Sequence, residues 1–289
     1  MLHIVTVHWL DDRWIEPQLR FIRKNVPDEF RVYASLHGID PARSSEFFYA
    51  EDSEGTHPEK LNRLADVVRG HASPDDLLLF VDGDAFPIAP VTEELLGDYS
   101  LAAVRRDENA NSPQPHPCFC LTTVGFWFAI EGDWRGGYMW QAANGDMLTD
   151  SGGNLLGVLT ERAIPWRPLL RSNRWNLDPL LYAIYGDAVY HHGAGFRAPV
   201  TYRVTLPSRD KVRAATASAL LPARVPVLGR LERSLRYRVA RRNETRRMAE
   251  YLDATQRQSD EVFTWIQTDD DFYQRFLTPG AADPADGPR

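Results

Sequence analysis

The segment Leu77-Leu-Leu-Phe-Val-Asp-Gly-Asp-Ala-Phe-Pro87 decides the fold. Its first five residues, Leu77 to Val81, form an unbroken apolar run, which is typical of a strand buried on both faces of a parallel sheet. Ligands of open α/β sheets bind outside the carboxyl ends of the strands, so Asp82 and Asp84 are expected at a ligand site. Gly83 leaves room between them for close approach of the backbone. Two carboxylates in this place predict a cation site.

The flanking sequence predicts an α/β fold with a mostly parallel sheet flanked by helices. Leu2 to Val7 and Phe30 to Leu36 are expected to be strands. A helix with apolar residues at a period of 3.6 is expected between them, and this strand, helix, strand order is typical of parallel sheets. A second helix is expected from the capping box at Thr56 to Glu59. Leu101 to Val104 and Cys118 to Ile130 are expected to be further strands, with a polar loop from Arg105 to Pro117 between them.

Composition favours a globular protein in the cytoplasm. The chain has 289 residues, and none of its apolar stretches approaches the roughly 20 residues that a membrane span needs. No basic leader precedes a long apolar segment at the N-terminus. The two cysteines, Cys118 and Cys120, are spaced to lie on one side of a strand, and without a nearby histidine cluster they do not predict a zinc site.

Charge divides the chain unevenly. Thirteen Lys and Arg residues and three acidic residues lie between Arg203 and Arg247, which gives this segment a net charge of +10. Since the whole chain has a net charge of −7, the remaining residues carry −17. We therefore expect a catalytic domain over 1–200, a basic helical extension over 201–277 and a disordered tail over 278–289. The basic helices suit contact with an anionic membrane surface, on the inner face of the membrane, or with a lipid-phosphate acceptor. Packing against the acidic remainder of the chain is an equal alternative, and nucleic acid is disfavoured because no binding motif accompanies the charge.

Asp82-Gly83-Asp84 after an apolar strand resembles the metal-binding signature of glycosyltransferases of the GT-A fold. The resemblance extends from about Leu2 to Arg197 and rests on the order of the elements as well as on the motif. It implies a GT-A-like sheet, a nucleotide-diphosphate sugar as donor, and Mn²⁺ or Mg²⁺ held against the diphosphate. The acceptor half carries no motif that we can match, so the acceptor stays open between a lipid-linked compound and a polysaccharide.

The same resemblance implies the nucleotide-binding residues. In GT-A enzymes the end of the first strand borders the base, which here gives Thr6, Val7 and His8. The segment Lys60-Leu61-Asn62 resembles the family segment whose side chains touch the base and the phosphates, and it lies near the positive end of a helix dipole. The alternative for these residues is ordinary packing or a solvated helix face.

Two adjacent histidines, His191 and His192, precede the Gly-rich turn Gly193-Ala194-Gly195-Phe196-Arg197. Such a turn lets the backbone come close to a charged ligand, and Arg197 is suited to a phosphate. In many GT-A enzymes a histidine in this late position completes the metal site. Neighbouring residues of a strand point in opposite directions, so we expect one of the two to be a ligand, with the choice left open.

Asp150 has two interpretations. It precedes Ser151-Gly152-Gly153 and an apolar run, where a helix N-cap is expected at Asp150 or Ser151. By the resemblance it stands where GT-A enzymes often place an acidic residue, which would act as general base on the acceptor hydroxyl. A base here implies transfer with inversion, whereas its absence leaves retention open.

The predicted function is therefore metal-dependent transfer of a sugar from a nucleotide-diphosphate donor to an acceptor hydroxyl. A nucleotidyltransferase is the rival enzyme, but the residues after the first strand, His8 to Asp12, are unlike the glycine-rich basic loop expected there. The non-enzymatic rival is a scaffold protein at the membrane surface that keeps only the sheet of a GT-A enzyme.

Overall fold

The computed structural model describes residues 1–109, 111–142, 145–196, 212–214 and 226–278, with no side chains described for 226–231. The chain divides into two compact units, one made of Met1–Phe196 with the segment from Asp270 onward, the other of Arg197–Asp269. The predicted division into 1–200, 201–277 and 278–289 stays a prediction, and 279–289 lie outside the described residues.

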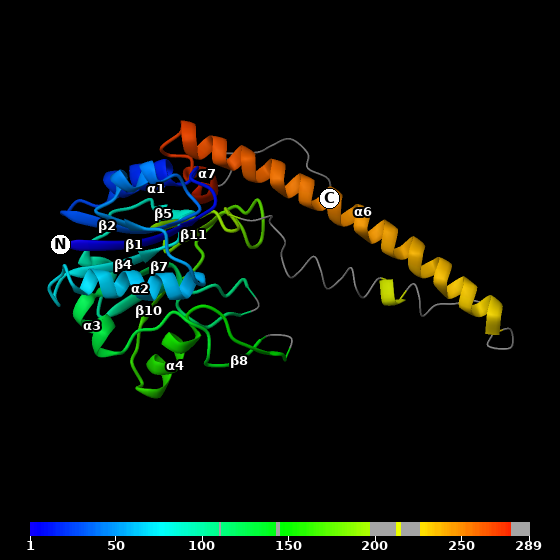
Figure 1. The fold of residues 1–289 in the computed structure, drawn as a ribbon, viewed down its shortest axis with the longest axis horizontal. Helices are drawn as coiled ribbons and strands as arrows, with labels where there is room; N and C mark the ends of the chain where they lie inside the picture. The colour runs from blue at the N-terminus through cyan, green and yellow to red at the C-terminus, as the bar shows by residue number, and fades with distance from the viewer. Residues whose placement is uncertain (110, 143–144, 197–211, 215–225, 279–289) are drawn as a thin grey trace. The chain divides into compact units, whose positions relative to one another are not determined.

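A mostly parallel sheet forms the centre of the first unit (Figure 1). Within the described residues it has seven strands in the order β10-β6-β7-β4-β1-β2-β3. The central strands β1 (Leu2–Trp9), β2 (Phe30–His37) and β4 (Leu77–Val81) are parallel, whereas β7 (His116–Thr123) is antiparallel to both β4 and β6 (Leu101–Val104). The predicted α/β class with a mostly parallel sheet is confirmed.

Helices cover both faces of this sheet. On one face Ile15, Leu19 and Ile22 of α1 (Ile15–Asn25) pack in a core with residues of β1, β2 and β4. On the other face the predicted apolar stripe of α2 (His57–Arg69) packs with α3 (Val124–Ala129) and α4 (Gly153–Glu161). The apolar run Leu78 to Val81 is fully buried between these two layers, as a central strand of such a sheet requires.

A small antiparallel sheet lies beside the central one. It has the order β11-β12-β5, with β5 (Ala85–Pro87), β11 (Ala183–Tyr185) and β12 (Val189–His191). The remaining strands are β3 (Tyr49–Glu51), β8 (Trp140–Gln141), β9 (Met147–Leu148) and β10 (Arg167–Leu169), and the short helices are η1 (Pro41–Glu46), η2 (Glu93–Leu95) and α7 (Gln274–Leu277). Next to α7, Phe272 packs on Phe21 and Phe86, which attaches the segment after Asp270 to the first unit.

Two local predictions are wrong. The strand expected over Cys118 to Ile130 ends at Thr123, where Thr123 accepts a hydrogen bond from the backbone of Phe126 and caps α3. The aromatic residues that suggested a strand therefore belong to a helix. Cys118 and Cys120 are buried in different packing clusters and not on one side of β7, because the register of β6 and β7 shifts between Ala103 and Val104.

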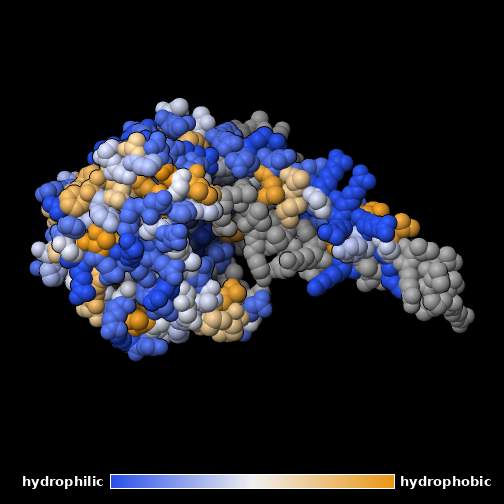
Figure 2. Space-filling model, viewed as in Figure 1, coloured by the Kyte–Doolittle hydropathy of each residue, from blue (hydrophilic) through white to orange (hydrophobic). Residues whose placement is uncertain are grey.

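The second unit contains α6 (Pro226–Thr268), a helix of 43 residues. Ion pairs one turn apart run along it, joining Glu232 to Arg236 and Glu250 to Arg246. In Figure 2 hydrophilic side chains cover most of its described part, with apolar side chains among them. None of the described helices combines the length and the apolar character that crossing a bilayer requires.

Candidate metal centre

Strand pairing brings together the two ends of the candidate site. The chain leaves β4 at Val81, passes through Asp82-Gly83-Asp84 and enters β5, which pairs with β12 so that Ala85 lies opposite His191. The backbone N–H of His192 donates to the carbonyl oxygen of Asp84 at 3.0 Å. The histidine pair is thus held against the acidic segment by backbone hydrogen bonds.

Asp82, Asp84 and His191 form a compact cluster. Each offers one ligand atom, and these atoms all lie within 4.8 Å of one another. The Nε2 atom of His191 lies 3.5 Å from Oδ1 of Asp84 and 4.0 Å from Oδ2 of Asp82. Asp84 and His191 are buried, and the side chain of Asp82 is 15% exposed. Of the histidines that the sequence left as alternatives, His191 is the one in the cluster.

Both carboxyl groups of the cluster are held in the charged form. Burial alone would raise the pKa of Asp84, but the charge of His191 and the N–H of Gly195 keep it well below its usual value. Burial likewise opposes ionisation of Asp82, and the neighbouring His57, His116 and His191 keep its pKa lowered. Two ionised carboxylates side by side in a buried place require nearby positive charge, which a divalent cation can supply.

Two histidines that sequence analysis did not single out lie beside the cluster. His57, the first residue of α2, places Nε2 at 3.1 Å from Oδ1 of Asp82. His116, the first residue of β7, has its ring 6.0 Å from that of His191, and burial, followed by the charge of Arg106, lowers its pKa to about 3. The capping box around His57 predicts the start of a helix but not this contact, and His116 lies in the segment expected to be a polar loop.

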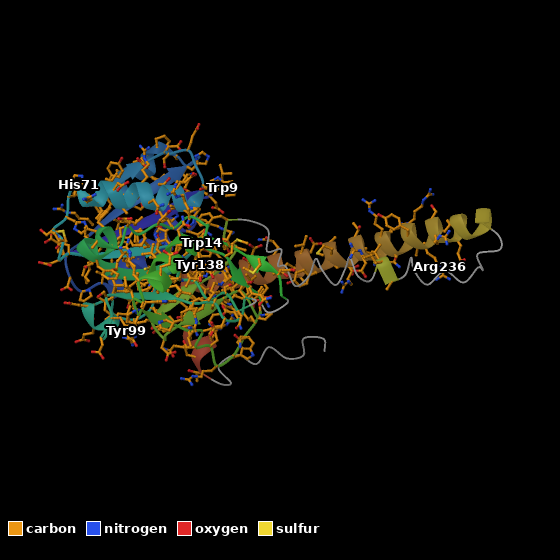
Figure 3. The ribbon with its side chains drawn as sticks, turned by 90° about the horizontal axis from the view of Figure 1, so that it is seen from below. Trp9, Trp14, His71, Tyr99, Tyr138 and Arg236 are labelled. Atoms are coloured by element: carbon orange, nitrogen blue, oxygen red, sulfur yellow. The ribbon has the colours of Figure 1, made fainter. Side chains whose placement is uncertain are left out.

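His192 lies apart from the cluster. Its Nδ1 is 2.9 Å from the hydroxyl of Tyr190, its ring lies 4.6 Å from that of Trp14, and burial lowers its pKa to about 3. Figure 3 shows Trp14 within the body of the first unit. His191 and His192 therefore point in opposite directions, as expected for neighbouring residues of a strand, and only His191 faces the cluster.

Gln18 of α1 links the end of β1 to the acidic segment. Its Nε2 donates to the carbonyl oxygens of Asp82, at 2.7 Å, and Ala85, at 2.9 Å, which leaves its Oε1 as an acceptor. Thr6 donates its hydroxyl to Oε1 at 3.0 Å, and Nε2 of His8 lies 3.1 Å from the same atom. In this network His8 carries its proton on Nε2, because an unprotonated Nε2 and Oε1 of Gln18 would be two acceptors facing each other.

The other nitrogen of His8 is turned towards Gly83. A Cβ atom on Gly83 would lie 2.9 Å from Nδ1 of His8 and 2.6 Å from the carbonyl oxygen of Val7, so this position accepts only glycine. Nδ1 is buried and has no hydrogen-bond partner among the described residues. Burial lowers the pKa of His8 to about 4, so it is a neutral acceptor. Val7 and His8 therefore lie next to Gly83, and Thr6 is joined to the acidic segment through Gln18, while their contact with a nucleotide base stays a prediction.

Lys60 and Asn62 both make contacts within the first unit. Lys60 is buried, so the alternative of a solvated helix face is wrong for this residue, and burial lowers its pKa. Asn62 donates from Nδ2 to Asp133 at 2.6 Å and accepts from the backbone of Trp134 at 3.0 Å. Both ends of its amide hold the segment between α3 and β8, and a contact with a nucleotide stays a prediction for either residue.

Asp150 is exposed and accepts a hydrogen bond from the backbone N–H of Ser151 at 2.8 Å. The N-cap of α4 is Gly152, with a φ of 87°, and not Asp150 or Ser151 as expected. The carboxylate of Asp150 therefore has no capping role, while its role as a base stays a prediction. Arg197 lies outside the described residues.

No family model and no curated protein sequence matches the chain. Among solved structures, it is similar to the glycosyltransferase GlyE of Streptococcus pneumoniae TIGR4 with 14% identity and a TM-score of 0.36, over 58% of this chain and 44% of that one. The chain thus spans less than half the length of GlyE.

Two further similar structures cover more of the chain. The galactosyltransferase LgtC, in complex with donor and acceptor sugar analogs, has 13% identity and a TM-score of 0.36 over 76% of this chain and 97% of that one. The mannosyltransferase PcManGT from Pyrobaculum calidifontis, in complex with GDP-Man and Mn²⁺, has 11% identity and a TM-score of 0.40 over 94% of this chain and 84% of that one. All three are glycosyltransferases by name.

Proposed function

We propose that the chain is a metal-dependent glycosyltransferase that moves a sugar from a nucleotide-diphosphate donor to an acceptor hydroxyl. The observation that carries this proposal is the cluster of Asp82, Asp84 and His191 at the carboxyl end of β4. This is where an open α/β sheet binds its ligand. The acidic pair and His191 come from distant parts of the chain, and the pairing of β5 with β12 joins them.

The donor set suits Mn²⁺, with Mg²⁺ as the alternative. Two carboxylate oxygens fit either ion, and an imidazole nitrogen favours Mn²⁺ because Mg²⁺ prefers oxygen ligands. A cation bound here would neutralise the diphosphate as it leaves the sugar. The chain's own contribution is to hold both carboxylates ionised and to aim one oxygen of each at the shared site.

The nucleoside would lie at the end of β1, beside Thr6, Val7 and His8. Their place beside Gly83 of the acidic segment supports this assignment, because ligands of an open α/β sheet bind at the carboxyl ends of its strands. Phe196 packs edge-on against the ring of His8 with the centroids 6.0 Å apart, and Arg197, the next residue, would contact a phosphate. Lys60 and Asn62 keep a predicted role in binding the donor through their place in the first turns of α2.

Asp150 is our candidate for the general base, supported by its exposed carboxylate, which caps no helix. With Asp150 as base, the acceptor attacks in one step and the sugar is transferred with inversion. An Asp150→Asn protein should keep Mn²⁺ and donor affinity and lose transfer, with the anomeric configuration of the product read by NMR. Transfer at the wild-type rate, or a retained configuration, would remove Asp150 from this role.

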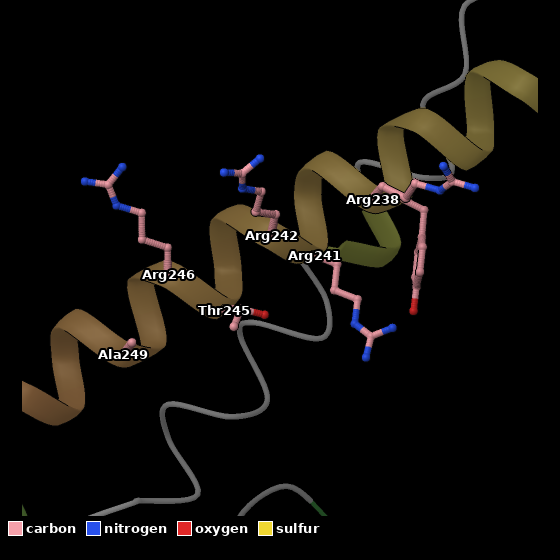
Figure 4. A pocket seen from close by; sticks show the side chains of 7 residues that line it. Arg238, Arg241, Arg242, Thr245, Arg246 and Ala249 are labelled. Carbon is pink, nitrogen blue, oxygen red and sulfur yellow. The ribbon is translucent and has the colours of Figure 1, made fainter.

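The acceptor is proposed to be lipid-linked or a polysaccharide, with α6 in contact with an anionic membrane surface. Arg238, Arg241 and Arg242 project from α6 in several directions (Figure 4). Leu235 and Val239, which are 59% and 58% exposed, lie among them. A bilayer surface accepts both kinds of side chain, because its headgroups pair with arginine while the apolar residues enter the interface.

Vesicles of phosphatidylcholine with and without phosphatidylglycerol test this contact. The wild-type protein should sediment with the anionic vesicles, and the triple variant Arg238→Gln, Arg241→Gln, Arg242→Gln should stay in the supernatant. Sedimentation of both proteins alike would remove α6 from membrane binding. A location in the cytoplasm stays a prediction.

The test of the reaction is a panel of nucleotide sugars in the presence of Mn²⁺. Slow release of the nucleoside diphosphate from one donor, accelerated by an acceptor extract, is expected for the wild type and not for Asp84→Asn. Release of pyrophosphate from a nucleoside triphosphate and a sugar phosphate would instead identify a nucleotidyltransferase. Vesicle binding without any effect of nucleotides on thermal unfolding would favour the scaffold protein.

A further inference from the structure

Each carboxylate of the metal cluster has one oxygen held by a protein group and one oxygen facing His191. In Asp84, Oδ2 accepts the backbone N–H of Gly195 at 2.8 Å, and Oδ1 lies 3.5 Å from Nε2 of His191. In Asp82, Oδ1 lies 3.1 Å from Nε2 of His57, and Oδ2 faces His191. Asp84 is thus held by a hydrogen bond from the Gly195 N–H, and Asp82 by an ion-pair contact with His57.

The position of His57 is fixed by the start of α2. The preceding residue, Thr56, is the N-cap, and its backbone N–H and its hydroxyl both lie 2.7 Å from Oε2 of Glu59. This capping box fixes the backbone at the start of α2, where His57 is the first residue of the helix. The side chain of His57 is 37% exposed, whereas that of Asp82 is 15% exposed.

His57 stands next to the cluster and not within it. In the described part of the chain, the group whose ligand atoms share a common 4.8 Å neighbourhood consists of Asp82, Asp84 and His191. A polar partner behind a ligating carboxylate selects which oxygen turns to the ion and restricts its rotation. Among the described residues Oδ1 of Asp82 has no hydrogen-bond partner, so its ion-pair contact with His57 is what opposes rotation of the carboxylate.

We propose that His57 is the positioning residue of the metal centre, which holds Oδ1 of Asp82 so that Oδ2 faces the cation. This inference rests on the proposed function, since it concerns the same metal site. It predicts that loss of His57 weakens Mn²⁺ binding by about 10- to 100-fold, the usual effect of losing the partner of a metal ligand. It also predicts that the number of imidazole ligands to Mn²⁺ does not change.

The test is Mn²⁺ binding to the full chain, measured by the loss of the free-ion EPR signal during titration. The wild type is compared with His57→Ala and His57→Gln. Glutamine can place an amide N–H near the position of Nε2, so His57→Gln should recover most of the affinity that His57→Ala loses. The matched control is His71→Ala, which removes an exposed histidine just beyond the C-terminal end of α2. Figure 3 shows His71 on the opposite side of the first unit from Trp9, the last residue of β1.

Pulsed EPR of the bound ion then counts the coordinated imidazoles. One imidazole, from His191, is expected in the wild type and in His57→Ala alike. Unchanged affinity in His57→Ala, or a second imidazole that disappears in that variant, would overturn the positioning role while leaving the metal site intact. A wild-type protein that binds no Mn²⁺, even with a nucleoside diphosphate, would overturn both the metal site and the role of His57.

Discussion

Gly195 donates its backbone N–H to Oδ2 of Asp84 at 2.8 Å, across 111 residues of sequence. The carbonyl oxygen of the same glycine accepts hydrogen bonds from Nη2 of Arg13, at 2.9 Å, and from Nε1 of Trp14, at 3.1 Å. One residue of the Gly-rich turn therefore connects the start of α1 to the acidic segment. The geometry of the metal centre depends on this turn as well as on the three candidate ligands.

The first prediction concerns Gly195→Ala. A Cβ atom there would lie 2.6 Å from Cβ of Asp84 and 2.9 Å from Cε2 of Trp14, both parts of buried side chains that cannot move aside. We expect a loss of about 1–3 kcal/mol in the free energy of unfolding, measured with urea, together with weaker Mn²⁺ binding. Gly70→Ala is the control, because its Cβ would meet only Val67 O at 3.4 Å. Equal Mn²⁺ affinity in wild type and Gly195→Ala would contradict the role of the turn.

The second prediction is a loss of stability in acid that His8 causes. Its pKa is about 4 in the folded protein, lowered by burial from 6.5, so the unfolded chain binds a proton more readily. The stability that neutral His8 contributes is therefore complete above pH 6.5 and is lost as the pH falls towards 4. The gap between these values corresponds to at most about 3 kcal/mol.

Urea unfolding at a series of pH values between 4 and 7 measures this effect. The free energy of unfolding of His8→Gln, which keeps a donor for Gln18, should fall less steeply with acid than that of the wild type. Parallel pH profiles for the two proteins would show that His8 is not buried as a neutral base.

The third prediction assigns Asn62 to the stability of the first unit. Its amide is bound to Asp133 and Trp134, and Asp133 also accepts from Nδ2 of Asn154 at 2.7 Å. Loss of a hydrogen bond to a charged group costs about 1.5–3 kcal/mol, so Asn62→Ala should lower the free energy of unfolding by that amount. The double variant with Asp133→Ala should lose less than the sum of the single variants. Unchanged stability would contradict this structural role of Asn62, whatever the variant does to nucleotide binding.

The central sheet was predictable because its signals are local. Leu101 to Val104 and Leu77 to Val81 are apolar runs bounded by polar residues, and they match β6 and β4. The capping box at Thr56 marked the start of α2 correctly. The prediction of a strand as far as Ile130 is wrong because Thr123 caps a helix in the middle of an apolar stretch. The residues stay apolar on both sides of Thr123, while the backbone changes from strand to helix.

The site was only partly predictable because it depends on pairings between distant segments. The order Asp82, Asp84, then a histidine indicated the cluster, but the register that places His191 opposite Ala85 is set by the β5 and β12 contact. The same limit applies to His57 and Gln18, whose contacts with Asp82 cross from helices to the end of β4. Nothing in the local sequence of either helix indicates these contacts.

The most direct test of the central claim is calorimetric titration of Mn²⁺ into the wild type, Asp84→Asn and His191→Ala, each with a nucleoside diphosphate present. Asparagine keeps an acceptor for the Gly195 N–H, so Asp84→Asn removes the charge and leaves the turn in place. The account predicts saturable binding of one ion to the wild type and its loss in both variants. Binding of Mn²⁺ to both variants with the wild-type affinity would contradict it.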